Sequence, residues 1–459
     1  MVFSSVLFLF RFLPAALAVY FLAPRRWRNL VLLIESLIFY SWGEVRYFPI
    51  MVASILVDFF ASNGIESHRD SPRACRGFLL LSVFFNLGSL AFFKYTGFFV
   101  SNLNALFGLS LTVPAFTLPL GISFYTFQTM SYTIDVYRGK VSAERSIIDF
   151  GAFVALFPQL IAGPIVRYTD VSRELKNRTI TPESFQDGAA VFIRGLGRKV
   201  LIANNIGSLW TEVSAMNFDL ISTPLAWLAL LAYSFQIYFD FSGYSLMAIG
   251  LGKMLGFEFP QNFNDPYIAK SVTDFWRRWH MTLGSWFREY LYFPLGGNRC
   301  SKGRHIFNMF VVWAATGLWH GASWNFVLWG LYFFVFLVLE KYFLLHWLER
   351  SLVLSHLYLL FLVVLSWALF AITDFSALGR FLTALFAGRG GTEWVYYFRS
   401  YIVTFVIAAV CSTPALSLLG ARLKKKAPAL LYAAAALVLV VSCAYLVDAT
   451  YNPFLYFRF

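Results

Sequence analysis

The sequence is poor in charge for its length. Of its 459 residues, 13% are charged, whereas a soluble domain has about a quarter. Hydrophobic residues make up 59% of the chain, and Phe, Trp and Tyr alone make up 20%. A globule cannot bury that much apolar surface, so part of it must face lipid. The low charge excludes an ordinary soluble protein and indicates an integral membrane protein.

Familiar site motifs are missing too. The four cysteines are scattered without a CxxC pair, and there is no HExxH motif, so neither a disulfide framework nor a metal site is expected. GxSxG, Walker A and GxGxxG are absent, which leaves no signature of a bound cofactor. The HxxxxD motif of soluble acyltransferases is absent as well, because Ser285 and Asn325 stand five residues after His280 and His320.

Long runs of alternating apolar and polar residues are also lacking, which argues against a membrane β-barrel. Apolar runs of helical length take their place, and about 11–13 of them are predicted as transmembrane or re-entrant helices. We expect an all-α polytopic membrane protein with one domain over residues 1–459. The runs lie near 3–22, 29–45, 48–64, 77–95, 115–133, 147–166, 187–209, 222–256, 305–319, 323–345, 354–373, 398–418 and 428–447.

The net charge of +13 comes largely from short basic links between the apolar runs. This pattern is typical of cytoplasmic loops and gives no reason to expect nucleic acid as a partner. Three links, at 25–28, 68–76 and 424–426, can all be cytoplasmic if both termini lie on the outer face. The aromatic segment 451–459 is then expected at the outer interface. The run from Val2 to Leu22 has no basic segment before it and is predicted to be a retained first helix.

One region, residues 261–303, is too polar to span lipid and too apolar for a solvated loop. It is predicted to form amphipathic helices that lie along the interface or dip into a protein-lined cavity. His280 ends its Asp-Phe-Trp-Arg-Arg-Trp-His segment. The tryptophans and arginines of this segment also fit an interfacial anchor, which explains His280 less well.

His320 stands between two strongly apolar runs in Leu-Trp-His-Gly. An ionisable residue at membrane depth is costly and tends to be functional. The alternative is a histidine satisfied by a group on a neighbouring helix. The other four histidines, at 68, 305, 346 and 356, are interpreted as ordinary interfacial residues.

Asp240 is the one acid in the apolar run 225–250 and shares a helix face with Gln236 and Tyr244. A buried carboxylate needs a partner, for which Arg277 and Arg278 are candidates. A structural ion pair and a catalytic role both remain open. Two further segments, 119–125 and 157–164, interrupt apolar runs with Pro and Gly, either as kinks or as broken helices that line a cavity.

These segments together resemble the membrane-bound O-acyltransferase family, and most of all its bacterial alginate O-acetyltransferase type. The similarity runs through most of the chain, from the first residues to the Leu-Trp-His-Gly motif. The matching segments are residues 1–5, 118–125, 160–164, 238–245, 262–267, 274–280 and 317–321.

The resemblance implies a ring of membrane helices around a thin central region pierced by a tunnel, in the bacterial inner membrane. It implies that His320 is the catalytic histidine and that His280 is the second histidine of the site. It also implies a separate extracytoplasmic esterase-like partner and a polysaccharide acceptor such as alginate, cellulose or peptidoglycan.

The expected reaction is acyl transfer from a thioester, with acetyl-coenzyme A as the donor, to a hydroxyl. A buried neutral imidazole can take the proton of that hydroxyl. His320 is predicted as the base and His280 as a group that positions substrate or stabilises the oxyanion. Substrate contacts are expected from Asp240, Asn262, Trp276, Arg278 and Trp319. The alternative is a transporter or flippase for a lipid-linked sugar or acyl carrier, which would also need broken helices and buried polar residues.

Overall fold

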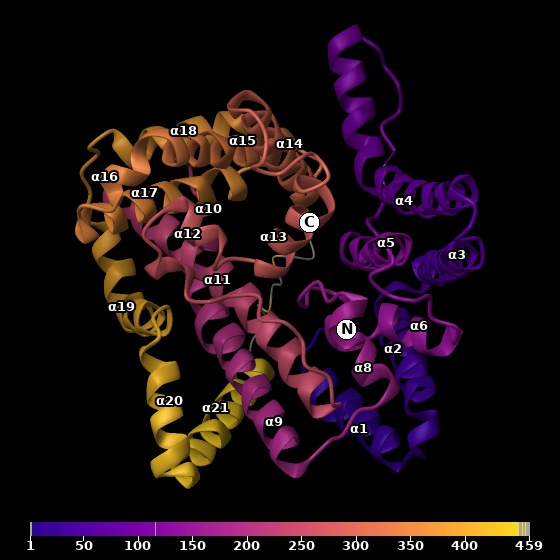
Figure 1. The fold of residues 1–459 in the computed structure, drawn as a ribbon. Helices are drawn as coiled ribbons and strands as arrows, with labels where there is room; N and C mark the ends of the chain where they lie inside the picture. The colour runs from indigo at the N-terminus through magenta and orange to yellow at the C-terminus, as the bar shows by residue number, and fades with distance from the viewer. Residues whose placement is uncertain (1, 115, 449–451, 453–454, 456–459) are drawn as a thin grey trace. The chain divides into compact units, whose positions relative to one another are not determined.

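The computed structural model describes residues 2–114, 116–448, 452 and 455 (Figure 1). All regular secondary structure in these residues is helical. Six helical segments are long and apolar enough to cross a membrane: 25–67, 72–107, 324–348, 352–371, 393–411 and 428–448. The prediction of an all-α polytopic membrane protein is therefore confirmed. The ring around a tunnel and the single domain remain predictions.

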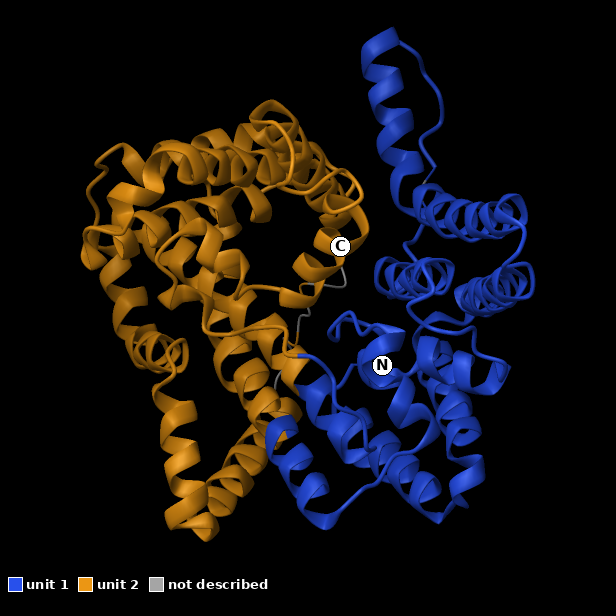
Figure 2. Ribbon diagram, in the orientation of Figure 1, with its two compact units in different colours: residues 1–192, 247–260 blue, residues 193–246, 261–459 orange. Residues whose placement is uncertain are grey.

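The chain divides into two compact units, which Figure 2 colours separately. The first contains residues 1–192 and 247–260. Its helices are α1 (Leu13–Leu22), α2 (Arg28–Glu44), α3 (Phe48–Ser67), α4 (Pro72–Phe107), α5 (Ile122–Tyr137), α6 (Ile147–Ala155), α7 (Phe157–Leu160), α8 (Tyr168–Lys176) and most of α9 (Pro182–Gly197), with a π-helix, η1 (Phe8–Phe12), before α1 and 3-10 turns η2 (Arg25–Trp27) and η3 (Val45–Tyr47).

The second unit contains residues 193–246 and 261–459. Its helices are η4 (Arg198–Asn204), α10 (Asn205–Ser214), most of α11 (Thr223–Met254), η5 (Pro266–Ile268), α12 (Val272–Trp276), α13 (Met281–Phe287), η6 (Arg288–Tyr292), α14 (Lys302–His320), α15 (Trp324–Leu339), η7 (Glu340–Leu344), α16 (Leu345–Leu348), α17 (Leu352–Ala371), α18 (Phe375–Phe386), α19 (Glu393–Cys411), α20 (Ala415–Lys426) and α21 (Pro428–Asp448).

A buried polar cluster joins α3, α4 and α5 in the first unit. The Asp58 carboxylate accepts hydrogen bonds from the Ser82 hydroxyl, from Asn86 Nδ2 at 2.7 Å and from Thr133 Oγ1 at 2.9 Å. The Asn86 carbonyl in turn accepts from Thr129 Oγ1 at 3.1 Å. Because each polar group is satisfied by another, the cluster holds three helices together without exposing polar atoms to lipid.

The two interrupted segments of the first unit meet each other. Gly121 has φ of +71° and directly precedes α5, and a Cβ there would lie 2.6 Å from the Leu160 carbonyl oxygen at the end of α7. The break between α6 and α7 leaves the Phe157 N–H without a helical acceptor. This N–H donates instead to Ser36 Oγ at 3.0 Å. Segment 157–164 is therefore a break in a helix, where Ser36 replaces a lost helical hydrogen bond, whereas segment 119–125 contains the start of α5.

Glycines bring α14 and α15 into close contact in the second unit. A Cβ on Gly317 would lie 2.4 Å from the Phe326 carbonyl oxygen, and a Cβ on Gly330 would lie 2.4 Å from the Trp313 carbonyl oxygen. Small residues at such positions allow helix backbones to approach in membranes. This contact fixes the end of α14, where His320 stands.

Several predicted boundaries are wrong. The run expected at 115–133 begins its helix at Ile122, because the prolines at 114 and 119 prevent a helical start; residue 115 lies outside the described residues. The run expected at 187–209 is part of a longer helical stretch from Pro182 to Ser214 that contains η4. Helix α4 continues to Phe107, and α18 and α20 were not expected.

Candidate active site

His320 is the last residue of α14 and is 2% exposed. Aromatic rings from three helices surround its imidazole. The ring centroid of Trp319 lies 5.1 Å away, that of Trp329 on α15 4.9 Å and that of Phe370 on α17 5.4 Å. The histidine is therefore held in a largely apolar, aromatic environment inside the second unit.

The turn after His320 depends on the absence of a side chain. Gly321 has an extended backbone, but a Cβ there would lie 2.3 Å from the Phe326 ring. Phe326 is 6% exposed and its ring lies 5.0 Å from that of Phe370. Because Gly321 of the Leu-Trp-His-Gly motif has no side chain, Phe326 in the first turn of α15 can pack against Phe370, which also contacts His320.

His280 lies between α12 and α13 and is 1% exposed. Its φ is +45°, a conformation that a residue other than glycine adopts at a cost of order 1–3 kcal/mol. Its Nδ1 lies 3.2 Å from the Asn262 Oδ1 oxygen. The same oxygen accepts from the Thr282 N–H at 3.3 Å and from Thr282 Oγ1 at 2.9 Å.

This network fixes the tautomer of His280. A backbone N–H can only donate, so the atom of Asn262 that receives it from Thr282 is the carbonyl oxygen. His280 Nδ1 must then carry a proton to donate to that oxygen, which leaves the lone pair on Nε2. His280 lies outside the six candidate spans, and burial lowers its pKa to about 3, so the ring is neutral near pH 7.

Trp319 contacts both histidines. The centroid of its ring lies 5.7 Å from that of His280 and 5.1 Å from that of His320. The two histidines come from segments 40 residues apart, and α12 and α14 both pack against α15. The structure thus brings three of the predicted site residues together.

Asp240 on α11 forms a buried ion pair with Lys199 on η4. The Lys199 Nζ lies 2.5 Å from Asp240 Oδ1, and the side chains are 1% and 2% exposed. The other carboxylate oxygen accepts from the Leu455 N–H at 2.8 Å. The predicted partners of Asp240, Arg277 and Arg278, are therefore wrong.

Gly243 explains why a lysine reaches this carboxylate. A Cβ on Gly243 would lie 2.8 Å from the Gly195 carbonyl oxygen and 3.0 Å from the Lys199 nitrogen, so the backbones touch at this point. This contact brings Lys199 beside Asp240, one turn away on α11. The next residue, Phe241, places its ring 4.7 Å from that of His280. The Lys199–Asp240 pair thus joins η4 to α11, the helix whose Phe241 contacts His280.

The remaining predicted site residues differ in position. Arg278 Nε pairs with Asp274 Oδ1 at 2.9 Å, one turn back on α12, and the Arg278 side chain is 28% exposed. The Trp276 ring lies 5.5 Å from that of Trp329, which also contacts His320. Trp276 is therefore linked to His320 through the Trp329 ring.

The tryptophans of this region belong to the core and do not form an interfacial anchor. Trp279 is 2% exposed, and its ring lies 5.0 Å from that of Trp367 and 5.5 Å from that of Phe275. Trp286 is 5% exposed. The buried tryptophans of this segment pack inside the second unit, whereas the Arg277 side chain is exposed.

Glu340 supports the site, although the sequence alone had not singled it out. It is fully buried, and its carboxylate accepts from the Val272 N–H at 2.5 Å, the Thr273 N–H at 2.9 Å and Thr273 Oγ1 at 2.8 Å. These are the first N–H groups of α12, which have no partner within the helix. A lone acid in the apolar run 324–348 was the signal that could have identified it.

His305, which the sequence predicts to be an ordinary interfacial residue, is buried among neighbouring helices. It is 4% exposed, with Nε2 at 2.8 Å from the Tyr292 hydroxyl and Nδ1 at 2.6 Å from the Tyr342 hydroxyl. It joins η6, α14 and η7. His356 is also structural, because its Nδ1 donates to the Ala269 carbonyl at 2.9 Å.

Comparison with known proteins points to one family. The model of the membrane-bound O-acyltransferase family matches residues 140–378. That range contains His280, His320, the Lys199–Asp240 pair and Glu340.

Individual relatives agree. The chain is 41% identical over 392 residues to the probable alginate O-acetylase AlgI of Azotobacter vinelandii, which covers 84% of this chain and 78% of the relative. It is 38% identical to the peptidoglycan O-acetyltransferase of Helicobacter pylori, over 72% of this chain and 68% of that protein. It is 29% identical to the teichoic acid D-alanyltransferase of Bacillus subtilis, over 49% and 59%.

Proposed function

Because the chain belongs to the membrane-bound O-acyltransferase family, we propose that it moves an acetyl group from cytoplasmic acetyl-coenzyme A towards the hydroxyls of an extracytoplasmic polysaccharide. The observation that carries this proposal is that two buried histidines both contact the Trp319 ring. Relatives are named for alginate and peptidoglycan acetylation, and an acceptor of this class fits the chemistry.

In this mechanism His320 is the general base. Its imidazole takes the proton of the acceptor hydroxyl as the hydroxyl oxygen attacks the thioester carbonyl carbon. The carbon–sulfur bond then breaks, and the thiolate leaves with the proton returned by the imidazolium. Such base catalysis contributes roughly 10²–10⁴ in rate, and orientation and oxyanion stabilisation supply the rest.

His280 has a positioning role in this mechanism. With the proton on Nδ1 and directed to Asn262, its Nε2 accepts a hydrogen bond and does not donate one. An oxyanion needs a donor, so the tautomer favours orientation of the acceptor hydroxyl over oxyanion stabilisation. Asn262 holds this tautomer.

The remaining parts of the proposal concern donor and partner. Basic links such as Arg25 to Arg28 attract the phosphates of coenzyme A if they are cytoplasmic, as their charge predicts. The hydroxyl acylated at His320 belongs to an intermediate acceptor, from which a separate extracytoplasmic esterase-like protein transfers the acetyl group to the polysaccharide. Both termini then lie on the outer face of the bacterial inner membrane.

The test is transfer of radiolabelled acetyl from acetyl-coenzyme A by the purified chain in liposomes, with a candidate extracytoplasmic partner supplied. We expect His320→Ala to lose at least about a hundredfold in turnover while inserting normally. His356→Ala is the matched control, because it removes a histidine that donates to a backbone carbonyl away from Trp319. Near wild-type turnover in His320→Ala would remove the base assignment.

A further inference from the structure

Trp329 on α15 has a buried indole N–H without an acceptor. The residue is 1% exposed, and no hydrogen-bond acceptor of the described residues lies within reach of its Nε1 atom. A buried tryptophan usually finds a partner for this donor, because an unpaired buried N–H costs about 1–3 kcal/mol. A donor that stays unpaired in the resting protein needs an explanation, and an acceptor atom that arrives with the substrate provides one.

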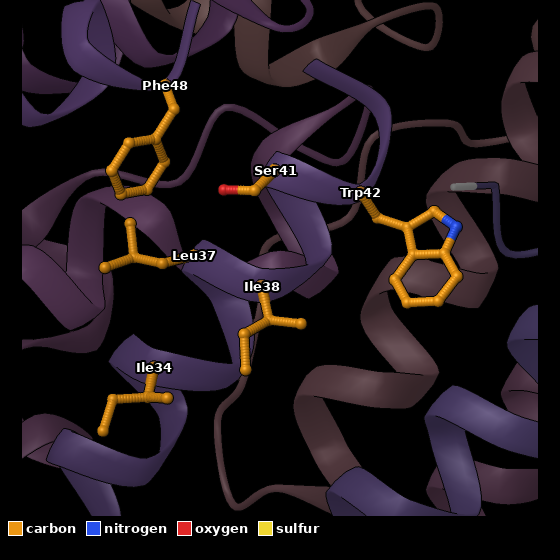
Figure 3. A pocket seen from close by; sticks show the side chains of 6 residues that line it. All are labelled: Ile34, Leu37, Ile38, Ser41, Trp42 and Phe48. Carbon is orange, nitrogen blue, oxygen red and sulfur yellow. The ribbon is translucent and has the colours of Figure 1, made fainter. Parts of the chain in front are cut away.

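An exposed tryptophan needs no such explanation. Trp42 lines a groove of about 450 Å³ between α2 and α3 in the first unit (Figure 3). The other lining residues are Ile34, Leu37, Ile38, Ser41 and Phe48. The Trp42 side chain is 61% exposed, so its N–H can donate to water or to a lipid headgroup. The Trp329 indole is enclosed instead, with the ring centroids of Phe333 and Phe370 at 5.1 and 5.2 Å.

The Trp329 ring lies directly beside the proposed base. Its centroid is 4.9 Å from that of the His320 imidazole, and the two ring planes are nearly perpendicular, at 84°. Backbone packing fixes this position, because Gly330, the next residue along α15, lies against Gly317 and the Trp313 carbonyl of α14. A shift of α15 along α14 would break that contact. The indole is therefore held against the imidazole by the same helix pair that carries both residues.

The proposed reaction requires a donor in this place. Attack of the acceptor hydroxyl on the thioester puts negative charge on the carbonyl oxygen, and an N–H aimed at that oxygen lowers the barrier. His280 cannot supply it, because its Nε2 accepts a hydrogen bond. The attacking oxygen is bonded to His320 and lies about 3–3.5 Å from the carbonyl carbon. The carbonyl oxygen is then close to the rings that contact His320, of which Trp329 has an unpaired N–H.

We propose that the Trp329 indole N–H stabilises the oxyanion of acyl transfer. It donates to the thioester carbonyl oxygen while the acceptor oxygen bonds to the carbonyl carbon and His320 takes the hydroxyl proton. The oxyanion then collapses to the new ester, the carbon–sulfur bond breaks, and the leaving thiolate takes the proton from His320. The indole keeps its own proton throughout. This inference rests on the proposed acyl transfer and adds a catalytic residue to it.

The experiment replaces the N–H alone. The tryptophan analogue β-(3-benzothienyl)alanine, introduced at position 329 by amber suppression, has sulfur in place of the N–H and nearly the same shape. In the liposome transfer assay we expect kcat to fall at least about a hundredfold, with KM for acetyl-coenzyme A unchanged, because the interaction forms only in the transition state. The melting temperature should not fall, since the resting protein loses no hydrogen bond. Trp329→Phe should show the same loss of kcat.

Trp367 on α17 provides the matched control. It is fully buried, its ring stacks on that of Trp329 at 6.1 Å, and its indole faces the Tyr267 hydroxyl, although too far away for a full hydrogen bond. The same analogue at position 367 should leave kcat within a few-fold of the wild type. An unchanged kcat at 329, or an equal loss at 329 and 367, would overturn the assignment of Trp329 alone. No turnover by the wild type, or full turnover by His320→Ala, would overturn the proposed acyl transfer and this assignment with it.

Discussion

His280 shows how much one side chain can be constrained by its neighbours. A positive φ, a fixed hydrogen bond to Asn262 and nearly complete burial act on the same residue. Strained conformations of this kind persist where surrounding structure over-determines them, and they concentrate at functional sites. The strain therefore adds to the reasons for placing His280 in the site.

Burial of His280 predicts a pH dependence of stability. Its pKa is about 3 in the folded protein and about 6.5 when unfolded. Because the folded pKa is lowered, its stabilising contribution is complete above about pH 6.5 and is lost as the pH falls from there towards 3. His280→Asn keeps a donor and tolerates positive φ but does not titrate.

Thermal unfolding in detergent between pH 7.5 and 5 measures this effect. The melting temperature of the wild type should fall more steeply with acid than that of His280→Asn. Parallel curves would mean that His280 takes up no proton on unfolding in this range.

Variants of the Lys199–Asp240 pair can distinguish a structural role of Asp240 from a catalytic role. Removing one partner leaves a buried, uncompensated charge, so Lys199→Met alone and Asp240→Leu alone should each destabilise by about 3–5 kcal/mol. The double variant should recover most of the lost stability, as measured by thermal unfolding in detergent. Acetyl transfer that returns with stability supports anchoring, and a stable but inactive double variant would make Asp240 catalytic.

At the scale of elements, short helices hold the site. Helix α12 has five residues, too few to be stable alone, and it closely precedes His280. Glu340 caps its first N–H groups from η7, so the end of α15 orients the segment that carries His280. Glycines perform the complementary task by setting α14 against α15 and α11 against η4.

Glu340→Ala should therefore lower both stability and acetyl transfer. Two buried N–H groups would lose their acceptor, at about 1–3 kcal/mol each, and α12 would lose its fixed start. Glu340→Gln keeps one acceptor oxygen and should recover part of both losses. Glu349→Ala, an exposed acid one helix later, is the control, and equal effects at 340 and 349 would rule out the capping role.

At the scale of the whole molecule, the distribution of basic links predicts orientation. The links at 68–76 and 424–426 should face the cytoplasm. Cysteines introduced as Asp70→Cys and Lys425→Cys should react with an impermeant maleimide only after spheroplasts are permeabilised. Labelling of either site in intact spheroplasts would contradict the predicted topology. The segment 451–459, expected at the outer interface, lies outside the described residues apart from positions 452 and 455.

The sequence by itself determined the class of the protein, since sparse charge and long apolar runs permit little besides membrane helices. It also singled out His320, because an ionisable residue between two strongly apolar runs is conspicuous, whereas His280 was singled out by the family resemblance of its segment. Only the tertiary structure decided which partners these residues have. Lys199 is 41 residues away in sequence from Asp240, and Glu340 is 67 residues away from Thr273, which it caps. Such pairings arise from helix packing, which the local sequence pattern does not record.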